Sequence, residues 1–119
     1  MHSKVYIGSD IKTTVTLTDE ATGVAYNLAS ATGVEVAIYQ QPGKVLQTAK
    51  LSASRVTIDD AAAGILSAYF DRSATDDMDV GSVFIDVRLT VTNANYQGGV
   101  QHVIVAGTKI GDAVRSVFT

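Results

Sequence analysis

Residues 82–91, SVFIDVRLTV, alternate between apolar and polar side chains. The odd-numbered positions are valine, isoleucine or leucine, and the even-numbered ones are mostly polar or charged. Because successive side chains of a strand point to opposite faces, this pattern predicts a strand with one buried face. Asp86 and Arg88 lie two residues apart on the other face. We interpret them as cross-strand charge pairs on the outside of a sheet.

The same period of two recurs along most of the chain. It predicts strands near residues 4–8, 11–18, 24–28, 34–41, 45–51, 55–59, 65–70, 82–92 and 100–107. The side chains expected inside are Val15, Leu17, Val36, Ile38, Ile58, Val83, Ile85, Val87 and Leu89. Helix is expected only as a short turn at 59–63 and in the tail at 111–117.

Turn residues separate these runs. The segment Gln41-Pro42-Gly43-Lys44 predicts a type II turn that joins two strands as a hairpin, and the ten glycines are expected between strands. Turn signals every 8–12 residues are typical of sandwiches. The sequence therefore predicts an all-β fold, an immunoglobulin-like antiparallel β-sandwich of two sheets with about seven to nine strands, in one domain of residues 1–119.

Composition narrows the classes of function. The 119 residues contain no cysteine, which excludes disulfides, zinc–thiolate sites and catalytic thiols. The net charge is −3 and the nine basic residues are scattered, so we expect no nucleic-acid partner. No run approaches the ~20 apolar residues of a membrane span, and the N-terminus lacks a signal-peptide pattern. We expect no membrane partner and synthesis in the cytoplasm.

Candidate chemistry is sparse. The acidic segment 71–79 lacks the ligand order and distal glutamate of a calcium-binding loop, so we interpret it as a solvated connection. His102 lies mid-strand, and the only other histidine is His2, so a general base or metal ligand would lack a partner. Nucleophile-elbow and phosphate-binding motifs are missing. We predict no catalytic, cofactor-binding or metal-binding residues, and no enzyme activity.

Several apolar side chains are candidates for an interface. Phe84 sits beside charges on the outer face of its strand, and Tyr96 lies in the polar loop 93–99, whose composition resembles that of recognition loops. Residues 110–119 form a candidate C-terminal arm, which either folds back on its own core or docks on a neighbouring subunit. The arm's apolar residues are Ile110, Val114, Val117 and Phe118. With poorly protected strand edges at both chain ends, this predicts a homo-oligomer or assembly with other proteins.

Five sequence features in order suggest a family. They are Ser9-Asp10 before the threonine-rich run 11–18, the step Asn27-Leu28-Ala29-Ser30-Ala31, the run 34–39, the Gly-x-Leu/Ile-x-Tyr type run 64–70, and an acidic loop leading to the long run 76–92. In these features residues 8–92 resemble the N-terminal domain of phage baseplate upper proteins and related immunoglobulin-like phage tail modules. The resemblance implies a virion structural protein, made in a bacterial host, that binds other virion proteins or itself. On the residues alone, a bacterial carbohydrate- or cell-surface-binding module and a small enzyme remain alternatives.

Overall fold

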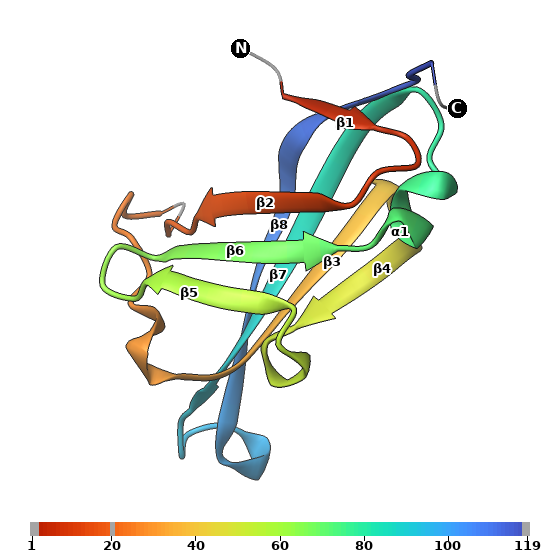
Figure 1. The fold of residues 1–119 in the computed structure, drawn as a ribbon. Helices are drawn as coiled ribbons and strands as arrows, with labels where there is room; N and C mark the ends of the chain where they lie inside the picture. Colours follow the sequence, from red (N-terminus) through yellow and green to blue (C-terminus); the bar gives the residue numbers. More distant parts are fainter. Residues whose placement is uncertain (1–2, 20, 118–119) are drawn as a thin grey trace.

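The computed structural model describes residues 3–19 and 21–117, and within them eight strands form two sheets packed face to face (Figure 1). One sheet has the order β1 (Lys4–Tyr6), β8 (Val100–Val114), β7 (Gly81–Thr92), β3 (Ala31–Gln41), β4 (Lys44–Lys50). The other has the order β2 (Ile11–Thr16), β6 (Ile65–Phe70), β5 (Val56–Asp60). The helices are α1 (Arg72–Asp76) and three short 3₁₀ turns, at Leu28–Ser30, Leu51–Ala53 and Gln97–Gly99.

The order of strands is immunoglobulin-like, as the sequence predicted. In the letters used for that fold, β2, β5 and β6 take the places of strands B, D and E, and β3, β4, β7 and β8 take those of C, C′, F and G. The first strand differs from the prediction of a purely antiparallel sandwich. β1 pairs in parallel with β8, from Lys4 opposite Asp112 to Tyr6 opposite Val114, and does not join β2.

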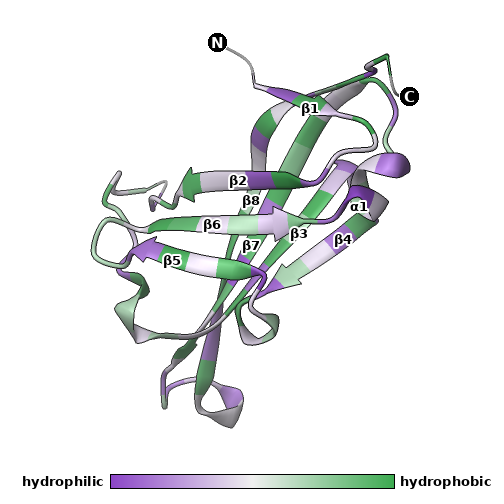
Figure 2. Cartoon of the chain, viewed as in Figure 1, coloured by the Kyte–Doolittle hydropathy of each residue, from purple (hydrophilic) through white to green (hydrophobic). Residues whose placement is uncertain are grey.

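The core lies between the sheets. Hydrophobic and hydrophilic residues alternate along the strands in Figure 2, and the inward side chains in the middle of β3 and β7 are buried. Seven of the nine predicted core residues are buried, namely Leu17, Val36, Ile38, Val83, Ile85, Val87 and Leu89. Val15 and Ile58 are only partly buried, because they lie on β2 and β5, the two outer strands of the smaller sheet.

The predicted hairpin at Pro42-Gly43 is confirmed. Gln41 pairs with Lys44, and Gly43 has φ +84°, the positive value that the third residue of a type II turn requires. A type I′ turn would need a positive φ at Pro42 as well, which the proline ring forbids.

Three sequence expectations are wrong. Residues 24–28 form no strand: Ala25 makes one isolated bridge to Thr18, and the segment crosses between the sheets. The tail 111–117 is not helical, since β8 continues to Val114 between β7 and β1; of the two alternatives for the candidate arm, residues 110–114 follow the one that folds back on the chain itself. Not every glycine separates strands, because Gly33, Gly107 and Gly111 lie inside β3 and β8.

Candidate interaction surface

The outer face of the five-stranded sheet, turned away from the smaller sheet, carries an aromatic row. Phe84 on β7 lies opposite Tyr39 on β3 and Lys109 on β8, and Tyr39 lies opposite Val45 on β4. The rings of Tyr39 and Phe84 stack, with centroids 5.9 Å apart and planes 25° from parallel. Both rings are half-buried, while Val45 is 55% exposed. The aromatic row, Val45, Tyr39, Phe84 and Lys109, thus offers ordered apolar surface in the middle of an uncovered sheet.

Asp86 holds this row in place. Its Oδ1 accepts hydrogen bonds from the Tyr39 hydroxyl at 2.7 Å and from the Gly107 backbone N–H at 2.8 Å. Gly107 presents its N–H because β8 bulges there, with φ +74°. The hydrogen bond to Asp86 is the main cause that raises the pKa of Tyr39, with burial and the carboxylate's charge adding to it. Asp86 is therefore a structural residue that fixes Tyr39, because its carboxylate is hydrogen-bonded to Tyr39 and to Gly107 within the sheet.

Arg88 forms the cross-strand charge pair that the sequence predicted. Its Nη2 lies 2.6 Å from Oε2 of Glu35 on β3. The pair is partly exposed, so it contributes at most about 1 kcal/mol. On the other side, β8 places Ile104 opposite Arg88, with 64% of its surface exposed. His102 is exposed too, and its Nδ1 lies 3.2 Å from the Thr90 hydroxyl.

The predicted interface residues do not form one patch. Phe84 belongs to the aromatic row. Tyr96 is 51% exposed in the β7–β8 loop, and this loop lies at the opposite end of the molecule from β1 (Figure 1). Ile110 and Val114 lie in β8, Ile110 half-buried and Val114 opposite Tyr6 of β1.

The tail beyond β8 is placed only in part. Val117 is 94% exposed. Phe118 lies outside the described residues. The structure thus separates the candidate arm into a paired strand segment and an exposed end.

The acidic segment 71–79 contains helix α1, which the sequence analysis missed. Ala74 of α1 and Met78, just after the helix, are buried against the core, but a helix of five residues is too short to show an apolar period in the sequence. Thr75 is also buried; its hydroxyl donates to the Ser9 carbonyl and accepts from the Gly8 N–H. Thr75 thus ties α1 to the turn between β1 and β2. Among the described residues, no three His, Asp or Glu side chains gather as a metal site would require.

A polar network covers the outer face of the smaller sheet. The buried Ser67 hydroxyl donates to Asp59 and lies 2.8 Å from the Thr14 hydroxyl. The bond from Ser67 is the largest cause that lowers the pKa of Asp59, helped by Thr57 and the charge of Lys12, and desolvation of the carboxylate opposes it. The network therefore stabilises the ionised carboxylate and links all three strands of this sheet.

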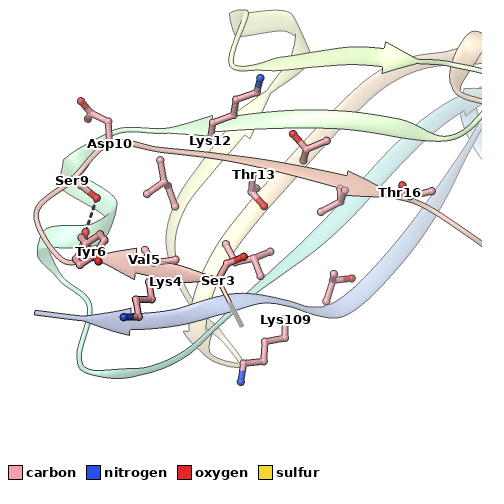
Figure 3. A pocket seen from close by; sticks show the side chains of 15 residues that line it. Ser3, Lys4, Val5, Tyr6, Ser9, Asp10, Lys12, Thr13, Thr16 and Lys109 are labelled. Atoms are coloured by element: carbon pink, nitrogen blue, oxygen red, sulfur yellow. Dashed lines mark hydrogen bonds between the residues drawn. The ribbon is translucent and has the colours of Figure 1, made fainter. Parts of the chain in front are cut away.

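A groove of about 620 Å³ runs between β2 and the β1–β8 side of the larger sheet (Figure 3). The sequence analysis did not predict this groove, because it forms only where β1 pairs with β8 and not with β2. Its lining includes the whole of β2, residues 3–6, and Thr108, Lys109 and Ile110.

Comparison with models of known protein families gave no match, and no curated protein matches the sequence. In the described part of the chain, no helix has the length and hydropathy needed to cross a membrane. The fold and surface thus define a class, the immunoglobulin-like all-β sandwich, with exposed apolar positions on one sheet.

Proposed function

We propose that this chain is a non-enzymatic assembly module, a phage or prophage virion structural protein of the baseplate or tail type. It acts through contacts with other virion proteins or with copies of itself, after synthesis in the bacterial host. Two lines support the proposal: the resemblance of residues 8–92 to phage tail modules, and a fold of the kind that the resemblance implies.

The aromatic row is the single observation that carries the assembly function. Interfaces are enriched in aromatic residues that present area with little loss of side-chain freedom on binding. Tyr39 meets this requirement, because its ring is stacked on Phe84 and its hydroxyl is held by Asp86 before any partner arrives. The exposed Val45 ends the row on β4, and Ile104, opposite Arg88, adds exposed apolar surface further along β8.

Val45→Glu and Ile104→Glu test this role, because each places a charge on the proposed contact without entering the core. Light scattering should show an oligomer for the natural chain and a lower mass for both variants. Ala62→Glu is the matched control: Ala62 is exposed in the turn between β5 and β6 of the smaller sheet, and the change should leave the mass unaltered.

A second measurement tests the virion assignment. Mass spectrometry of particles purified from the host strain should detect the natural chain at a fixed ratio to the other tail proteins, and should find less of the Val45→Glu chain. A strictly monomeric natural chain that is absent from such particles would contradict the proposal. Saturable binding to a glycan by that monomer would favour the carbohydrate-binding alternative instead.

A further inference from the structure

β2 is an open edge in the described structure. It pairs with β6 without interruption over six residue pairs, and no described strand pairs with its other side. The Leu17 N–H donates to the Gly64 carbonyl at 2.8 Å, so Leu17 directs its backbone groups toward the β6 side. Since these directions alternate along a strand, Lys12, Thr14 and Thr16 direct their N–H and C=O groups away from β6, to the open edge. In the immunoglobulin-like order, strand A would lie here.

The other outer strands have features that oppose pairing with another chain, and β2 lacks these features. β4 carries an irregularity in its pairing and begins and ends with lysine. β5 carries an irregularity and ends in Asp59 and Asp60, and β1 is only three residues long. Charge, bulges and short length are the devices that keep sheet edges from pairing with other chains. β2 has regular pairing, six residues, no proline and a single charge, Lys12.

The groove beside this edge leaves apolar surface incompletely covered. Ile11 and Val15 of β2, and Ile110 of β8, pack on the core but are only partly buried, and all three line the groove. Figure 3 shows β2 on one side of the groove and β1 with β8 on the other. A strand added to β2 would complete the smaller sheet and cover these side chains in one step.

Charge indicates the occupant. The groove is lined by three lysines, Lys4, Lys12 and Lys109, and one acidic residue, Asp10. Lys109 already pairs with Asp112 at 3.1 Å, so the formal balance of these five side chains is +1, in a protein of net charge −3. The Asp10 carboxylate already accepts the Arg72 N–H at 2.7 Å. An acidic segment therefore complements the groove, whereas the segment of this chain that follows β8, which carries Arg115, does not.

We propose that the open edge of β2 binds an extended acidic segment of a different protein. The segment adds antiparallel to β2 as a further strand, with apolar side chains toward the groove and acidic side chains outward near the lysines. Backbone hydrogen bonds to Lys12, Thr14 and Thr16 supply the binding, in the strand-addition mode. This inference deepens the proposed assembly function by naming the chemistry of a partner.

The test uses an end-capped peptide, Glu-Val-Thr-Val-Glu-Val-Thr-Val, titrated into the full chain and followed by amide NMR. We expect saturable binding with slower hydrogen exchange at the Lys12, Thr14 and Thr16 amides. In an antiparallel pair, directly opposite residues share a face. N-methylation of the Glu and Thr amides should therefore abolish binding, and N-methylation of the Val amides should preserve it. Replacing Glu by Lys in the peptide should weaken binding by about tenfold or more.

Variants of the chain provide the reciprocal test. Thr14→Pro removes an edge N–H where proline is tolerated in sheets, and should abolish binding. Lys4→Glu should weaken binding, whereas its control Lys44→Glu, on the distant strand β4, should not; this pair keeps the test valid if Thr14→Pro does not fold. Absence of saturable binding, or binding that survives both N-methylations, would overturn the proposal. The self-association test changes Val45 and Ile104, which do not line the groove, so either proposal can fail alone.

Discussion

Gly64, in the turn before β6, is a residue whose small size the fold requires. Its φ is +70°, and a Cβ at this position would lie 2.7 Å from the Leu17 carbonyl oxygen and 2.8 Å from that of Tyr26. Gly23 has nearly the same backbone conformation, φ +71°, but nothing lies within 4 Å of its would-be Cβ. Comparing alanine substitutions at the two glycines therefore separates the cost of backbone strain from the cost of steric crowding.

We predict that Gly64→Ala destabilises the fold more than Gly23→Ala does. Gly23→Ala should cost about 1–2 kcal/mol, the strain of a left-handed alanine. Gly64→Ala should add about 1–3 kcal/mol, because two backbone carbonyls must move. Urea denaturation of both variants measures the difference in free energy of unfolding. Equal losses would show that the contacts at Gly64 do not matter.

At the scale of single residues, the sequence predicted the features that depend only on residues adjacent along the chain. The turn at Pro42-Gly43 and the outward side of Arg88 follow from local chemistry and from the alternation of a strand. The partner of Asp86 did not follow, since the Tyr39 hydroxyl comes from a residue 47 positions away. Nor did the crowding at Gly64, because Leu17 and Tyr26 reach it only in the folded chain.

At the scale of elements, β8 shows why strand ends are hard to predict. Gly107 and Gly111 suggest turns, so the sequence predicted a strand that ends at 107. In the structure Gly107 forms a bulge that lets the strand continue, and Gly111 allows the Ser3 backbone to pass closely against β8. A glycine marks a turn, a bulge or a close contact, and only the neighbouring strands decide which.

We predict that the chain tolerates loss of residues 115–119 but not of 110–119. The shorter deletion removes no residue of β8, whereas the longer one removes the buried Ala113, the half-buried Ile110 and the pairing partner of β1. The longer deletion should cost at least about 3 kcal/mol from lost apolar burial alone. Thermal and urea unfolding of the two truncated chains measure this. An unchanged urea midpoint without 110–119 would restore the interpretation of this segment as an arm.

Helix α1 is held by distant residues rather than by its own sequence. The Asp71 side chain makes no capping bond and pairs with Arg55 at 3.0 Å instead. Asp10, 62 positions away, accepts the N–H of Arg72, and Gln47 of β4 accepts that of Asp71. A five-residue helix with external caps has little local signal, which explains why the sequence indicated a solvated loop.

At the scale of the whole molecule, the shape is elongated, with principal extents of 51 × 28 × 24 Å. The loop end of the β7–β8 hairpin extends beyond the smaller sheet (Figure 1). Here Val100 and Val103 are only partly buried, in contrast to the fully buried Val83 and Ile85 at the middle of the sandwich. Stability is therefore expected to fall along the hairpin toward its loop.

We predict that this hairpin end opens before the sandwich unfolds. Amides of residues 93–102 should exchange with solvent at least about a hundredfold faster than those of Val83, Ile85 and Val87, which open only with the core. Hydrogen exchange followed by NMR measures both groups, with β6 amides as a second reference for global unfolding. Uniform protection along the hairpin would contradict the prediction, unless dilution to the monomer restored the difference.

The sequence by itself determined that this protein is an all-β sandwich and which faces of its strands are buried. Alternation is a property of strand geometry, and turn chemistry acts within four residues, so both can be read locally. Only the tertiary structure decided that β1 pairs with β8 and leaves β2 open, that α1 closes one end, and that Tyr39 stacks on Phe84. The physical reason is that backbone hydrogen bonds are the same for every strand and do not depend on which residues form it. Any strand can pair with any other, and the choice rests on the packing of the whole chain.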